Sequence, residues 1–121
     1  MTRAQWIAKA DAICTRTNAQ VATYPVKTTS DFARALPPAA VYEHEEAIAL
    51  MRLVPPPSKA KDWKAVVTAT MQVAVNSAEL GREAVAGTFT IDSPLVAATT
   101  RANAIMGRIT LRDGFTSCAE L

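Results

Sequence analysis

The sequence predicts an all-α fold, in which one domain spanning residues 1–121 forms an up-down-up-down four-helix bundle. Half of the residues are hydrophobic, much of that half is alanine, and only four residues are glycine, a composition that favours helix. Prolines and glycines divide the chain into four long segments. Within each segment, apolar residues recur at spacings of three and four, as they do on one face of a helix.

The first helix is predicted to begin at a capping box, in which the Thr2 hydroxyl and the Gln5 side-chain amide each satisfy a free backbone N–H group. It should end near Thr23, because Tyr24 precedes Pro25 and a residue in that position disfavours helical angles. The expected inner face carries Trp6, Ala10, Ile13, Cys14, Thr17 and Val21.

A short extra helix is predicted before the second long helix. Ser30–Asp31 can cap it, and it should end near Ala35 because Leu36–Pro37 disfavours further helix. Pro38 suits the first turn of the second long helix, which Pro55–Pro57 should end. The expected inner face of that helix carries Val41, His44, Ile48 and Met51.

The third and fourth helices are predicted from their end signals. Ser58 is expected to cap the third helix, and Gly87 to stop it. Ser93, followed by Pro94 in the first turn, should start the fourth helix, which leaves the bundle at Asp113–Gly114. The expected inward faces comprise Trp63, Val66, Val67, Thr70, Val73, Ala74, Ser77, Leu80 and Ala84 on the third helix, and Leu95, Ala98, Ala102, Ile105, Ile109 and Arg112 on the fourth.

The two cysteines, Cys14 and Cys118, lie near opposite ends of the chain. In such a bundle the first and fourth helices are neighbours, and a tail that turns back after Gly114 can reach the first helix. A disulfide there would close a loop of about 100 residues and contribute about 4–5 kcal/mol on the chain-entropy model. Two buried reduced thiols are the alternative, since free cysteine packs as a small hydrophobe.

Three segments carry a resemblance to known proteins: WIAKADAICTRTNA near the start, LVPPPSKAKDW in the middle and GFTSC near the end. Together they resemble a group of small uncharacterised exported or lipoprotein-type helical proteins of actinobacteria, over nearly the whole chain. The resemblance implies a Cys14–Cys118 disulfide and a location outside the cytoplasm, secreted or attached to the cell envelope. It also implies a signal segment, or a lipid anchor, on a part of the protein that precedes this chain. It implies no particular activity.

The titratable residues predict little chemistry, and no cofactor is expected. His44 is the only histidine, whereas a ferritin-like di-iron site needs two, and the C-x-x-C-H motif of haem attachment is missing. We expect His44 to be partly buried and hydrogen-bonded. Antiparallel packing could still bring it near Glu79 and Glu83 in a carboxylate-rich cation site; the competing interpretation is a solvated charged face. The glutamates in question are Glu43, Glu45, Glu46, Glu79 and Glu83, with Arg52 and Arg82 as partners in the second interpretation.

Large side chains among many small ones are typical either of an interdigitated core or of an incompletely filled one that admits an apolar ligand. The residues that would line such a cavity are Trp6, Met51, Trp63, Met71 and Met106. An exposed apolar patch near the proline turns would instead meet a partner protein.

The sequence therefore predicts a non-catalytic binding or structural module of the cell envelope, whose partner is another envelope protein. The alternative is a carrier of a small apolar ligand in the bundle core, and a metal site or enzyme based on His44 ranks third. A net charge of +2 without a basic face or motif argues against a nucleic-acid partner. No stretch of about 18 apolar residues occurs, so no membrane span is expected.

Overall fold

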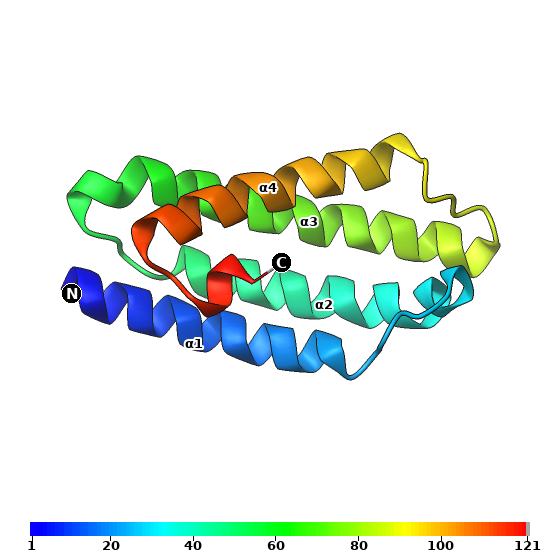
Figure 1. Cartoon of the computed structure of the whole chain (residues 1–121), viewed down its shortest axis with the longest axis horizontal. Helices are drawn as coiled ribbons and strands as arrows, with labels where there is room; N and C mark the ends of the chain where they lie inside the picture. Colours follow the sequence, from blue (N-terminus) through cyan, green and yellow to red (C-terminus); the bar gives the residue numbers. More distant parts are fainter. Residues whose placement is uncertain (121) are drawn as a thin grey trace.

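The computed structural model describes residues 1–120. It contains four long helices that alternate in direction along one bundle, as predicted (Figure 1). Three single turns of 3-10 helix lie in the connections and in the C-terminal tail. The elements are α1 (Arg3–Ala22), η1 (Thr29–Asp31), α2 (Phe32–Met51), η2 (Pro57–Lys59), α3 (Ala60–Ala86), α4 (Pro94–Asp113) and η3 (Ser117–Ala119). None of the helices formed by residues 1–120 is both long and apolar enough to cross a membrane.

The predicted ends of α1 and α4 are confirmed. At the start of α1 the Thr2 hydroxyl accepts from the backbone N–H of Gln5 at 3.2 Å, and Gln5 Oε1 accepts from the Thr2 N–H at 2.9 Å. At the start of α4 the Ser93 hydroxyl accepts from the N–H of Val96 at 3.2 Å. Gly114 ends α4 with φ +92°, a left-handed conformation that residues with a side chain rarely adopt. The chain can therefore reverse there into the tail.

The predicted break between a short helix and the second long helix is wrong. The single turn η1 does precede α2, but α2 begins at Phe32 and runs through Pro37 and Pro38. Each proline removes one helical hydrogen bond, so packing must offset the loss. Gly81 of α3 makes close packing feasible here, because a β-carbon at that position would lie 3.3 Å from the nitrogen of Pro37.

Two further expectations about α2 and α3 are wrong. Ser58 does not cap α3, since it lies inside η2 and α3 begins at Ala60. The inner face of α2 is rotated from the predicted stripe, because Val41, His44 and Met51 are exposed. Small residues let α2 approach α3 closely, and two of the α2 glutamates turn inward with them. The buried face of α2 carries Ala35, Ala39, Ala40, Glu46, Ala47 and Leu50.

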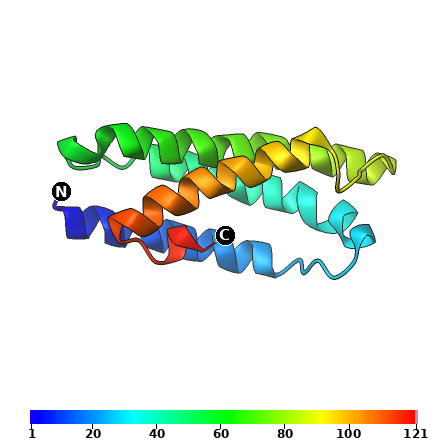
Figure 2. The same cartoon turned by 45° about the horizontal axis from the view of Figure 1, so that its top comes forward.

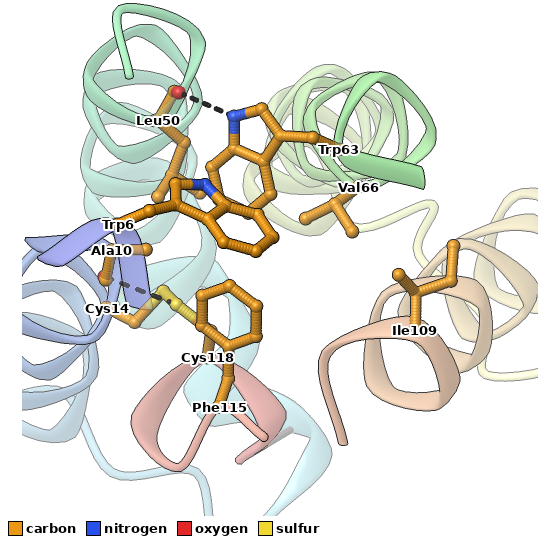
Figure 3. Packing of buried hydrophobic residues seen from close by; sticks show 9 residues of the cluster. All are labelled: Trp6, Ala10, Cys14, Leu50, Trp63, Val66, Ile109, Phe115 and Cys118. Carbon is orange, nitrogen blue, oxygen red and sulfur yellow. Dashed lines mark hydrogen bonds between the residues drawn. A yellow bond between two sulfur atoms is a disulfide. The ribbon is translucent and has the colours of Figure 1, made fainter. Parts of the chain in front are cut away.

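Three aromatic rings fill one end of the bundle (Figure 3). The ring centroids of Trp6 and Trp63 are 5.1 Å apart, and those of Trp6 and Phe115 are 4.9 Å apart, both edge to face. Trp63 Nε1 donates to the carbonyl of Leu50 at 3.2 Å, which ties α3 to α2. Rings of this size contribute much of the burial in a core in which alanine is the commonest residue. This end of the bundle is therefore closed.

The four helices do not pack equally. α2 packs against both α1 and α3, and α4 packs against α3, whereas α1 and α4 reach each other through η3 rather than along their lengths. Figures 1 and 2 show α4 inclined across the bundle, from beside α3 at its start towards the first turns of α1 at its end. There Arg3 donates to the backbone carbonyl of Asp113 at 2.9 Å. Away from this contact the two helices diverge.

Candidate functional site

The C-terminal tail forms one wall of the candidate site, and α1 holds it in place. Cys14 and Cys118 form a disulfide, with their α-carbons 5.1 Å apart, which confirms the pairing that the resemblance implied. The carboxylate of Asp11 accepts hydrogen bonds from the backbone N–H groups of Thr116 and Cys118 at 3.0–3.2 Å. Asn18 donates to the carbonyl of Ser117 at 3.1 Å. The turn η3 is thus fixed against α1.

The sulfur of Cys118 also lies 3.2 Å from the carbonyl oxygen of Ala10, as the dashed line in Figure 3 marks. A disulfide sulfur carries no proton, so this approach is a close contact rather than a hydrogen bond. The disulfide therefore borders the aromatic cluster on one side and the cleft described next on the other.

A cleft of about 390 Å³ opens into the bundle where α1 and α4 diverge. All four helices and the C-terminal tail contribute to its lining. Thr17 and Val21 come from α1, Asn103 and Met106 from α4, and the disulfide closes one end. Its apolar walls are built by Leu50, Val66, Val73 and Met106.

Two carboxyl groups of α2, those of Glu43 and Glu46, lie in this cleft. Glu46 is only 8% exposed, and Glu43 Oε2 is buried without a hydrogen-bond partner among the protein's own groups. Burial raises the pKa of Glu43 to about 7; the neighbouring charge of Glu46 adds to the rise, and the Ser77 hydroxyl opposes it. Burial likewise raises the pKa of Glu46 to about 7, against an opposing effect of the Thr17 hydroxyl. Both groups therefore titrate near neutral pH.

The residues that were predicted to line a ligand cavity are dispersed. Met106 lines the cleft. Trp6 and Trp63 are packed in the adjoining aromatic cluster, Met51 is 56% exposed, and Met71 is half-buried on α3. The large side chains thus fill one end of the core, and smaller ones leave the space beside it.

The residues of the weaker metal hypothesis do not come together. His44 is exposed, contrary to the expectation that it would be partly buried. Glu79 forms an ion pair with Arg82 on the surface of α3, as expected for a solvated charged face. Glu83 is half-buried. Within residues 1–120, no group of three His, Cys, Asp or Glu side chains is placed to hold a metal ion.

Sequence reasoning missed the importance of Glu43 and Glu46, because glutamates in a helix are normally assigned to its solvated face. A signal was present in their spacing. Glu43, Glu46 and Leu50 follow at steps of three and four, and Ala39 and Ala47 lie on the same side of the helix. A stripe of alanines containing two carboxyls is a sequence pattern that predicts inward-facing acids.

A second concavity lies outside the bundle, between the outer faces of α2 and α3. It is a larger but more open groove of about 790 Å³, flanked by valines, of which Val41 and Val75 are each 55% exposed and Val85 is 69% exposed. His44 and Arg82 lie along its edge. Unlike the cleft, this groove contains no buried carboxyl.

Neither a protein-family model, nor a curated protein, nor a solved structure matches the chain. The resemblance to exported actinobacterial proteins therefore stays a prediction.

Proposed function

We propose that the protein binds a small, largely apolar ligand in the cleft between α1 and α4, and that it does so as a binding module without a catalytic step. One observation carries the proposal, namely an apolar-walled cleft of about 390 Å³ that reaches into the core of a small bundle. Small-molecule sites generally have volumes of about 300–1,000 Å³ and mostly apolar walls with a few polar groups. Burying apolar ligand surface would supply the affinity, at about 25 cal/mol for each Å².

This function is the carrier role that the sequence offered as an alternative to an interaction module. We also propose that the protein acts outside the cytoplasm. The Cys14–Cys118 disulfide supports that location, because disulfides persist in oxidising compartments and are rare where thiols are kept reduced. Docking on an envelope protein, the first expectation from the sequence, stays a prediction.

The test is to fill the cleft and measure the loss of binding. We would titrate 1-octanol, a neutral probe with an apolar chain, into the protein by isothermal calorimetry at pH 8. Asn103→Trp places a large ring at the cleft wall, and Ala104→Trp places the same ring on the exposed side of α4, as a matched control. We expect Asn103→Trp to abolish octanol binding and Ala104→Trp to leave it unchanged. Equal binding by all three proteins, or no binding to the unchanged protein, would contradict the proposed function.

A further inference from the structure

We propose that the ligand of the cleft carries a cationic group, an amine or ammonium attached to an apolar body, and that Glu43 and Glu46 bind this group. The inference rests on the proposed function and specifies the chemistry of its ligand. It follows from the charges in the cleft, from the hydrogen bonds already made there, and from the burial of the two carboxyls.

The charges of the lining are all of one sign. Three acidic side chains border the cleft, those of Glu43, Glu46 and Glu120, and no lysine, arginine or histidine among residues 1–120 lines it. The chain as a whole has 13 basic and 11 acidic residues. A lining whose charged side chains are all acidic, in a slightly basic protein, favours a positively charged occupant.

The threonine hydroxyls of the cleft are already used as donors by the protein. Thr70 donates to the carbonyl of Val66 at 2.8 Å, and Thr110 donates to that of Met106 at 2.6 Å. The Thr17 hydroxyl has one proton, which it shares between a carbonyl of its own helix at 3.3 Å and the Glu46 carboxyl. Acceptors remain, and the clearest is Glu43 Oε2, which is buried without a partner. A ligand that satisfies this site must bring hydrogen-bond donors, as an ammonium group does.

The burial of the two carboxyls strengthens their interaction with a cationic group of the ligand. Glu46 is nine-tenths buried and Glu43 lies one helical turn away, so a cation between them would be shielded from water. A charged hydrogen bond in such surroundings is stronger than one on the surface. Since burial holds the pKa of both groups near 7 in the empty protein, a bound cation is expected to lower that pKa and to release protons on binding.

The experiment uses three probes that share an eight-carbon chain and differ only in charge: octylammonium, 1-octanol and octanoate. Each is titrated calorimetrically into the protein at pH 8, where both carboxyls are ionised. We expect octylammonium to bind at least about tenfold more tightly than octanol, and octanoate to bind more weakly than octanol.

Isosteric variants assign the effect to residues. Glu46→Gln and Glu43→Gln should each weaken octylammonium binding by about tenfold and change the affinity for octanol by less than about twofold. The retained octanol binding also verifies that the variants are folded. Glu45→Gln removes an exposed carboxyl from the same helix and should change neither affinity. Equal affinity for octylammonium and octanol, or tightest binding of octanoate, would overturn the cationic ligand and leave the proposed function standing. If none of the three probes binds, the proposed function itself fails.

Discussion

The buried carboxyls should make the stability of the empty protein fall as the pH rises from about 5 to 8. The folded state raises the pKa of Glu43 and of Glu46 from the ordinary 4.5 to about 7, so it favours their protonated forms. That preference contributes stability that is fully present below pH 4.5 and is lost as the pH rises through 7. A pKa that is one unit higher in the folded state corresponds to about 1.4 kcal/mol. Each group can therefore contribute a loss of about 3 kcal/mol of unfolding free energy.

Such a loss is large compared with the usual free energy of unfolding of a domain, which is about 5–15 kcal/mol. The assay is urea unfolding of the oxidised protein at pH 5, 6, 7 and 8, followed by circular dichroism. We expect the free energy of unfolding to fall across this range in the unchanged protein and to vary far less in the Glu43→Gln/Glu46→Gln double variant. Glu45→Gln should keep the original slope. The reasoning is refuted if the unchanged protein is as stable at pH 8 as at pH 5, or if the double variant retains the full slope.

Two further predictions concern how the chain is held together. Replacing both Cys14 and Cys118 by alanine removes the disulfide, which joins residues 104 positions apart. The free energy of unfolding should fall by about 4–5 kcal/mol, measured as a lower urea midpoint. A loss under about 1 kcal/mol would contradict this prediction. Lys59→Met removes the nearer cation, at 2.9 Å, from the 2%-exposed carboxylate of Asp113. Arg112 remains at 3.7 Å, so the loss should be about 2 kcal/mol. Arg82→Met breaks only a solvent-exposed pair, so its cost should stay below about 1 kcal/mol, and similar losses in the two variants would count against the buried pair.

Much of the fold could be predicted from the sequence because its signals are local. The capping box at Thr2 and Gln5, the Ser93 cap and the glycine that ends α4 act over a few residues, and all are found as expected. The continuous helix through Pro37 could not be predicted in this way. Its stability depends on the close approach of α3 at Gly81, which is distant in sequence.

The candidate site was largely hidden from sequence reasoning for a related reason. A cleft depends on where two helices diverge, and the inclined α4 meets α1 at its far end through residues distant in sequence, such as Arg3 and Asp113. The rotation of α2 that turns Glu43 and Glu46 inward likewise depends on close packing of small residues against α3. The sequence contains a few large side chains among many small ones, but it does not show which end of the bundle the large ones fill.

The most direct test of a ligand site inside the bundle is a methyl NMR map of the protein with and without octylammonium. Val73 and Met106 line the cleft, whereas Val75 and Val85 belong to the outer groove between α2 and α3. We predict that the methyl signals of Val73 and Met106 shift with increasing octylammonium and that those of Val75 and Val85 do not. Shifts confined to Val75 and Val85 would place the ligand on the outer surface and contradict the cleft as the functional site.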